Sequence, residues 1–233
     1  MIAVECIDVT KSYGDKETST QALRGISLEA YAGELLMLVG PSGCGKTTLL
    51  SIISGIMRQD SGMCYVYGQD LSVLSQTELT AYRGANIGFI FQHFNLIPTL
   101  TAIENVSIPL VLSGVEKSVA FEHAEKLLER VGLSSRKHAY PPHMSGGEQQ
   151  RIAICRGCVH APRLIVCDEP TSALDHHTGI EVLKLFRDIA LSRDSSLIIV
   201  THDARIFDFA DRILRLDDGR IVSVKHNHHS PPS

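Results

Sequence analysis

The sequence predicts an α/β fold, with a parallel core sheet, a small antiparallel sheet near the N-terminus and an inserted α-helical subdomain. Three continuous apolar runs, at 34–40, 163–168 and 196–201, have the character of strands buried on both faces. Helical patterns lie between these runs, and buried strands that alternate with helices are typical of a parallel α/β core. Between about residues 85 and 160 the apolar spacing becomes helical, which indicates the insertion.

The first elements along the chain are short strands. Residues 2–9 alternate as a strand does, and 26–30 and 64–67 are further candidates, each followed by a glycine turn. We expect these three segments to form the antiparallel sheet. Helical spacing follows Lys46 and recurs at 181–191.

The whole of residues 1–225 is expected to form one domain. Its α/β core covers about 1–84 and 161–225, and the helical insertion covers about 85–160. The polar segment 226–233 is expected to be a disordered tail.

The composition restricts the classes of function. Lys plus Arg number 22 and Asp plus Glu 26, a net charge of −4, which argues against a nucleic-acid binder. Six scattered cysteines in a chain of 233 residues are expected to be reduced thiols of a cytosolic protein. We expect no signal peptide, and no apolar run approaches the roughly 20 residues that span a bilayer. Any membrane part must then come from another chain.

A glycine-rich run carries the clearest chemical signal. Residues 40–48 match the pattern G-x-x-x-x-G-K-[ST], between a buried strand and a helix. Such a loop curls backbone N–H groups around a phosphate, and the helix start adds positive potential. Lys46 is expected to reach the β- and γ-phosphates of ATP, and the Thr47 hydroxyl to bind Mg²⁺. The alternative is a structural turn, against which the intact pattern argues. The expected nucleotide-binding residues are Gly40, Pro41, Ser42, Gly43, Cys44, Gly45, Lys46, Thr47 and Thr48.

Two adjacent carboxylates end the second buried strand. Asp168 is expected to hold Mg²⁺ through water, and Glu169 to polarise the attacking water as general base. Alone, such a pair is also compatible with a solvated turn. The phosphate-binding loop in the same chain favours the catalytic interpretation.

Five further segments, taken with this loop, resemble the ABC ATPase family in content and order. They are Tyr13 in a Lys-Ser-Tyr-Gly run, Phe91-Gln92, Met144–Arg151 with Ser145-Gly146-Gly147-Glu148, Asp168–Asp175, and Thr201-His202-Asp203. The resemblance covers nearly the whole chain and implies a P-loop NTPase with a RecA-like core. It implies that Tyr13 stacks on adenine, that Gln92 reaches Mg²⁺ or the attacking water, and that His202 contacts the γ-phosphate.

The resemblance also implies a head-to-tail homodimer with two ATP molecules at its interface. In that dimer the Ser145-Gly146-Gly147 turn of one chain faces the nucleotide of the other. Position 148 departs from the family, because Glu replaces the usual Gln. Each weaker motif has a plain structural alternative: Ser145 as a helix N-cap, His202 as a strand-end histidine, and Tyr13 as a surface tyrosine.

Two other features suggest metals or redox chemistry and are discounted. Cys155 and Cys158 form a C-x-x-C pair without a second pair, on the helix that follows the signature. The three histidines of the tail are compatible with a transition-metal site, but solvation is the simpler interpretation.

The segment 91–106 resembles the lipoprotein-release, macrolide-export and cell-division subgroup, and the segment 201–212 resembles the branch of heterocyst glycolipid exporters and related efflux pumps. This resemblance implies a peripheral subunit at the cytoplasmic face of the inner membrane that drives separate permease subunits. A periplasmic adaptor is a further candidate partner, and the cargo would be a lipid, lipoprotein or hydrophobic compound. The alternatives are a soluble ATPase that acts on ribosomes or DNA, and a non-transporting regulator of cell-wall hydrolysis.

The segment after Gln92 is rich in apolar residues, which gives a hypothesis for the permease contact. We expect some of these residues to line a groove for a short permease helix. The alternative is that all of them fill the core of the helical insertion. They are Phe94, Leu96, Ile97, Leu100 and Ile103.

Overall fold

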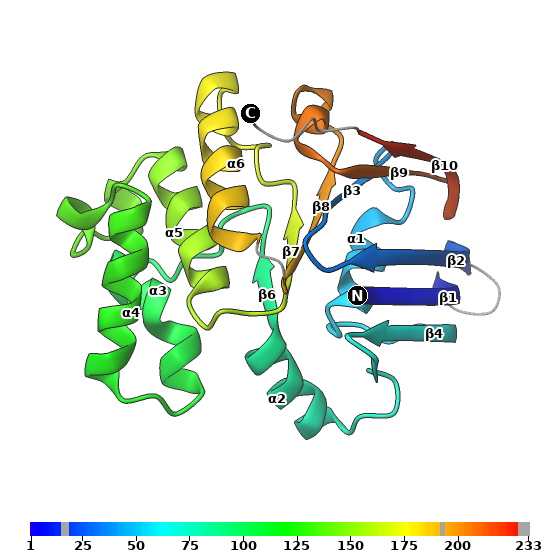
Figure 1. The fold of residues 1–233 in the computed structure, drawn as a ribbon, viewed down its shortest axis with the longest axis horizontal. Coiled ribbons are helices and arrows are strands. Elements are labelled where there is room, and N and C mark those ends of the chain that lie inside the picture. The colour runs from blue at the N-terminus through cyan, green and yellow to red at the C-terminus, as the bar shows by residue number, and fades with distance from the viewer. Residues whose placement is uncertain (15–18, 192–193, 228–233) are drawn as a thin grey trace.

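The computed structural model describes residues 1–14, 19–191 and 194–227, and contains two sheets with helices packed around them (Figure 1). The first sheet is antiparallel, with strand order β2-β1-β4-β5. Its strands are β1 (Ile2–Tyr13), β2 (Thr20–Tyr31), β4 (Ser61–Val66) and β5 (Gln69–Asp70). The expected N-terminal antiparallel sheet is confirmed.

The second sheet is the core, with strand order β10-β9-β3-β8-β7-β6. The five strands from β9 to β6 run parallel, and β10 pairs antiparallel with β9 at one edge. The strands are β3 (Leu35–Val39), β6 (Ile87–Ile90), β7 (Leu164–Asp168), β8 (Ser196–Thr201), β9 (Arg212–Asp217) and β10 (Arg220–His226). The fully buried β3, β7 and β8 are the three apolar runs of the sequence.

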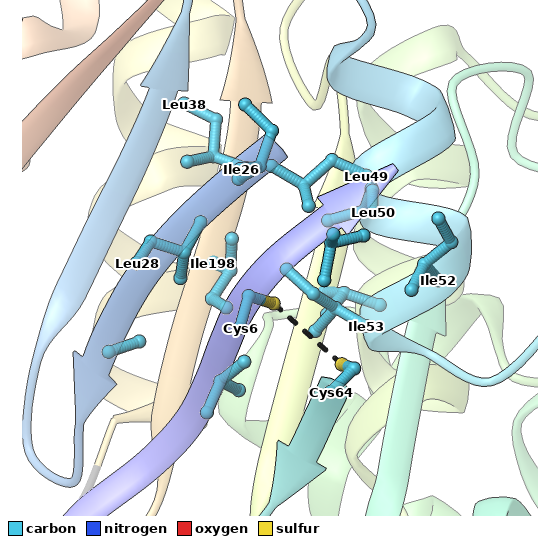
Figure 2. Packing of buried hydrophobic residues seen from close by; sticks show 14 of the residues in the cluster. Cys6, Ile26, Leu28, Leu38, Leu49, Leu50, Ile52, Ile53, Cys64 and Ile198 are labelled. Carbon is cyan, nitrogen blue, oxygen red and sulfur yellow. Dashed lines mark hydrogen bonds between the residues drawn. The ribbon is translucent and has the colours of Figure 1, made fainter. Parts of the chain in front are cut away.

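Of the six α-helices in the described part of the chain, three form one group and a fourth lies between the two sheets. The helices α3, α4 and α5 lie together on the side of the molecule away from the antiparallel sheet (Figure 1), with a buried cluster of their own. The helix α1 packs between the two sheets, where its leucines and isoleucines meet side chains of both (Figure 2). The helices are α1 (Lys46–Ile53), α2 (Gln76–Asn86), α3 (Ala102–Leu112), α4 (Lys117–Arg130), α5 (Gly146–Cys158) and α6 (His176–Ala190), with 3-10 turns at Ser134–Arg136, Pro141–His143 and Ala204–Phe209.

The structure places the start of the helical insertion and the start of the C-terminal tail later in the chain than the sequence predicts. The insertion was placed from about residue 85, but β6 pairs with β7 inside the core sheet, so the helical segment begins after residue 90. The tail was placed from residue 226, but His226 ends β10, and the Asn227 amide donates to the Phe207 and Ala210 carbonyls at 2.9 Å each. Residues 228–233 of the expected tail lie outside the described residues.

None of the described helices is long and apolar enough to cross a membrane.

Candidate active site

The site lies where three parallel strands end at the same edge of the core sheet. Val39, the last residue of β3, pairs with Thr201, the last residue of β8, and Asp168 of β7 pairs with Val200. The segments that follow these strands therefore meet, as is usual for ligand sites of open α/β sheets. The pairing brings together the glycine-rich loop, the Asp168-Glu169 pair and His202.

The glycine-rich loop packs so closely on its neighbours that side chains are excluded at two positions. A Cβ atom at Gly45, where φ is 104°, would lie 2.5 Å from the Ala22 carbonyl oxygen, and one at Gly40 would lie 2.1 Å from that of Leu216. The ammonium group of the buried Lys46 donates to the Gly40 and Pro41 carbonyls at 2.8 Å each. The loop thus forms a tight cradle with a lysine across it, which fits a phosphate group.

Oxygen groups suited to a magnesium ion lie beside this cradle. The Thr47 hydroxyl donates to the Asp168 carboxylate at 3.1 Å. Burial raises the pKa of Asp168, while the bond from Thr47 opposes that shift. A hydroxyl and a desolvated carboxylate are hard oxygen ligands, so these two residues fit Mg²⁺, which would offset the cost of burying the charge.

A second carboxylate faces a histidine. The Glu169 carboxylate lies 2.6 Å from the His202 Nδ1 atom, and the Thr201 hydroxyl donates to its other oxygen at 3.4 Å. Glu169 has a φ of 52°, and its amide donates to the Val200 carbonyl at 2.8 Å, which anchors this left-handed residue to β8. The carboxylate is therefore buried and oriented, while the His202 side chain remains 67% exposed.

These groups line one cavity of about 740 Å³. The structure also brings Gln92 to this cavity, although Gln92 is distant in sequence. The hydroxyl of Tyr13, a residue of the cavity wall, lies 3.2 Å from the Thr48 hydroxyl. Of the expected site residues, the cavity is lined by Tyr13, Pro41, Ser42, Gly43, Gly45, Lys46, Thr47, Thr48, Gln92, Asp168, Glu169 and His202.

The family model described as ABC transporter matches residues 23–172. The chain belongs to this family. Over 222 residues it is 41% identical to an uncharacterized ABC transporter ATP-binding protein of Thermotoga maritima, a match that covers 95% of this chain and 94% of that protein. It is 43% identical over 220 residues to the lipoprotein-releasing system ATP-binding protein LolD of Geobacter metallireducens, covering 94% of this chain and 98% of LolD.

A third relative and a solved structure agree with this assignment. The macrolide export ATP-binding/permease protein MacB of Escherichia coli K12 is 40% identical over 219 residues, which cover 94% of this chain and 34% of MacB. A dimeric, post-hydrolysis structure of the ATP-binding cassette MJ0796 with ADP and Pi matches with a TM-score of 0.89 and 35% identity, over 97% of this chain and all of that one. The expected fold class and family are confirmed, and the chain is an ATP-binding subunit of an ABC transporter.

The signature segment of this ABC subunit lies outside the cavity: Ser145, Gly146, Gly147 and Glu148 do not line it. Ser145 is the N-cap of α5, and its hydroxyl accepts from the Glu148 amide at 3.3 Å, while its own amide donates to the Glu148 carboxylate at 2.8 Å. The helix-cap alternative for Ser145 therefore holds in the single chain. It does not exclude a second role, because the turn remains exposed at Ser145.

Two contacts of the signature were not visible in the sequence. The Glu148 carboxylate accepts from the Arg136 guanidinium at 3.1 Å, so the unusual acid at this position has a cation of its own. The backbone bond from Ser145, together with Arg136, holds the pKa of Glu148 below its ordinary value. A Cβ atom at Gly147 would lie 2.7 Å from the Thr178 methyl group, so this glycine lets α5 approach α6.

Cys155 and Cys158 are buried in α5. The Cys155 thiol faces the Leu127 carbonyl at 3.7 Å, and burial raises the pKa of Cys158 to about 12. A thiol of this kind is poorly ionised at neutral pH, so neither cysteine is suited to redox or metal chemistry in the folded chain.

Proposed function

We propose that this ABC subunit is a Mg²⁺-dependent ATPase that works as a head-to-tail homodimer and drives separate permease subunits. The observation that carries the proposal is the cavity, which collects Lys46, the Thr47–Asp168 pair and the Glu169–His202 pair around one phosphate cradle. Mg²⁺, when bound, would be held by Thr47 and Asp168 and would neutralise charge that develops on the phosphates.

Each of these cavity residues has a distinct role in ATP binding or hydrolysis. Lys46 matches the charge of the terminal phosphates, and Tyr13 offers a ring for the adenine. Glu169 accepts the proton of the attacking water, since it is the buried carboxylate that does not bond to Thr47. His202, bonded to Glu169, orients that carboxylate and can donate its other ring nitrogen toward the γ-phosphate.

The homodimer is supported by the position of the signature turn, which does not line the nucleotide cavity of its own chain. The signature turn at Ser145 is an exposed helix start, which favours an anion, yet it lies outside the cavity of its own chain. A partner chain related by a two-fold axis brings this turn to the open side of the nucleotide. The dimeric MJ0796 cassette, 35% identical, supports this arrangement.

Hydrolysis is tested by phosphate release from ATP, with Mg²⁺ and with EDTA, for the wild type and for Glu169→Gln. We expect the wild type to require Mg²⁺, and Glu169→Gln to bind ATP but to hydrolyse it about 10²–10⁴-fold more slowly. Wild-type turnover in the variant would contradict the role of Glu169 as base.

The contact with the permease is proposed at a larger cavity of about 960 Å³, between α2, β6, α3 and α5. Its wall is mainly apolar, and Ile56 and Leu112 on its rim are 49% and 83% exposed. None of the five apolar residues expected to form such a groove lines it: Leu96 and Ile103, for example, pack into the helical cluster instead. The hypothesis that this run contacts the permease stays a separate prediction.

We assign this larger cavity to a short permease helix, because the relatives LolD and MacB belong to export systems and MacB carries its permease in the same chain. Leu112→Asp should leave the ATPase activity of the isolated subunit unchanged and weaken assembly with a co-expressed permease. Val224→Asp, at a 51% exposed apolar residue of β10, is the matched control and should leave both unchanged. Equal assembly of both variants would contradict the assignment.

The relatives also support the cargo class and the location. We propose export or extraction of a lipid, lipoprotein or hydrophobic compound, by a subunit at the cytoplasmic face of the inner membrane, with a periplasmic adaptor as a further partner. Release of a labelled lipoprotein from vesicles that contain the assembled complex tests this proposal. ATP-driven release from vesicles without the permease would contradict it.

A further inference from the structure

The loop that carries Gln92 has an unfavourable backbone that must be held by its surroundings. Gln92 follows β6 by two residues and lies in the wall of the nucleotide cavity. Immediately after it, Phe94 and Asn95 have φ values of 56° and 48°. Two successive non-glycine residues in the left-handed region cost free energy that contacts elsewhere must offset.

One side chain supplies those contacts. The Arg156 guanidinium donates from Nη1 to the Asn95 carbonyl at 2.6 Å and from Nη2 to the Phe94 carbonyl at 2.7 Å. The planar fork of an arginine offers two parallel donors on separate nitrogens to two adjacent acceptors, whereas a lysine must direct both bonds from one nitrogen on a shorter side chain. Arg156 therefore binds both left-handed residues at once.

Close packing of α5 on β6 fixes the position of the Arg156 backbone, from which the guanidinium extends. Arg156 precedes Gly157, and α5 packs on β6 at Gly157 and Gly88. A Cβ atom at Gly88 would lie 2.1 Å from the Gly157 carbonyl oxygen, so the helix and the strand are in close contact. The strand that leads to Gln92 and the helix that carries Arg156 thus keep a constant spacing.

A second side chain holds the far half of the same loop. The buried Asn105 of α3 accepts from the Ile97 amide at 2.8 Å and donates to the Ile97 and Leu100 carbonyls at 3.0 Å each. Asn105 therefore holds the loop from Ile97 onward, and Arg156 holds the part of the loop nearest Gln92.

Arg156 also lies in the wall of the larger cavity, the proposed docking site of the permease helix. We propose that Arg156 is a positioning residue, which holds Gln92 in the nucleotide cavity through the Phe94 and Asn95 carbonyls and links it to the larger cavity. This inference rests on the proposed ATPase function. According to this proposal, a permease helix that enters the larger cavity shifts Arg156 and so changes the position of Gln92.

The first test uses hydrogen exchange in the nucleotide-free protein, which does not depend on activity. Arg156→Lys keeps the charge, but its side chain is shorter and has one donor nitrogen in place of the two-pronged guanidinium. The bonds to the Phe94 and Asn95 carbonyls should therefore weaken, and the amides of residues 93–96 should exchange faster. Arg187→Lys is the matched control, because Arg187 also donates to a backbone carbonyl, that of Phe209, at 2.6 Å, and lies outside both cavities. The control should leave exchange at 93–96 unchanged, and unchanged exchange in Arg156→Lys would overturn the proposal.

The second test is a double-mutant cycle in the ATPase reaction. Arg156→Lys should lower kcat about 10–100-fold, the scale expected for a misplaced catalytic group, and leave the KM for ATP nearly unchanged. In a Gln92→Ala background the same change should have almost no further effect, because the group that Arg156 positions is gone. Arg187→Lys should leave kcat unchanged in both backgrounds.

An equal fold loss in both backgrounds would mean that Arg156 acts through general stability and would overturn the proposal. If Arg156→Lys does not fold, Arg156→Gln serves in the same cycle, since water from the adjoining cavity can fill the space. Failure of the wild type to hydrolyse ATP would instead contradict the proposed function. In that case the exchange experiment still tests whether Arg156 holds the loop.

Discussion

Glu148 stands where the family signature usually has Gln, and its two contacts can be separated by substitution. Its carboxylate closes the capping box with Ser145 and forms an ion pair with Arg136 at 3.1 Å. Glu148→Gln retains a capping group, because Gln also serves at this position of a capping box, but removes the charge. Glu148→Ala removes both contacts.

The ion pair and the cap determine how much each substitution should lower the free energy of unfolding. The side chains of Arg136 and Glu148 are 40% and 20% exposed, so solvent screens the ion pair, and its loss should cost about 0.5–1 kcal/mol. Loss of the cap in Glu148→Ala should cost about 1 kcal/mol more. For a chain of this length each kcal/mol lowers Tm by roughly 2–4 °C.

The bond from the Ser145 amide and the ion pair with Arg136 both favour the ionised Glu148 carboxylate, which predicts a pH dependence. The pKa of Glu148 is lowered from its ordinary value of 4.5, so the folded state binds this proton more weakly than the unfolded state. The stabilisation is therefore present above pH 4.5 and is lost as the pH falls through the lowered pKa of the folded protein. The difference between the wild type and Glu148→Gln should shrink across the same range.

Urea unfolding of the three proteins at pH 7 and at pH 4 measures these differences. We expect the order wild type, Glu148→Gln, Glu148→Ala at pH 7, and a smaller gap between the first two at pH 4. Equal losses for Gln and Ala at pH 7 would refute the assignment of a cap to this residue. A gap that is unchanged at pH 4 would refute the ion-pair contribution.

Three further predictions follow from the site and its surroundings. Gly147→Ala should reduce ATP hydrolysis while a single chain still binds ATP, and adding Thr178→Ser, which removes the methyl group that the new Cβ meets, should restore part of the activity. Lys46→Ala should weaken ATP binding sharply by calorimetry while the fold survives, and unchanged affinity would contradict its role. Cys155 and Cys158 should resist iodoacetamide in the native protein and react in urea, as mass spectrometry of the digested chain will show, because burial raises their pKa.

Much of the fold and of the candidate site could be predicted because the informative residues are contiguous. The three apolar runs are strands buried on both faces, and a strand of that kind is visible in a short window of sequence. The glycine-rich loop is likewise recognised from one contiguous pattern, although the atoms that exclude a side chain at Gly40 and Gly45 belong to Leu216 and Ala22, outside the loop.

The remaining features depend on contacts between distant segments. The four-residue strand β6 has no distinctive pattern, and only its pairing with β7 identifies it. The larger cavity forms between α2, α3 and α5, so no single apolar segment predicts it, and the apolar run after Gln92 does not line it. The bonds from Arg156 to the Phe94 and Asn95 carbonyls join residues more than 60 positions apart and involve no side chain of the loop.

The central element of the proposed mechanism is a nucleotide site that two chains complete together. Light scattering of Glu169→Gln, with and without ATP and Mg²⁺, tests it most directly, because slow hydrolysis preserves any ATP-dependent dimer. We predict a mass near the 25.5 kDa of one chain without nucleotide, and twice that mass with ATP. A single-chain mass at an ATP concentration that saturates binding by calorimetry would contradict the shared site.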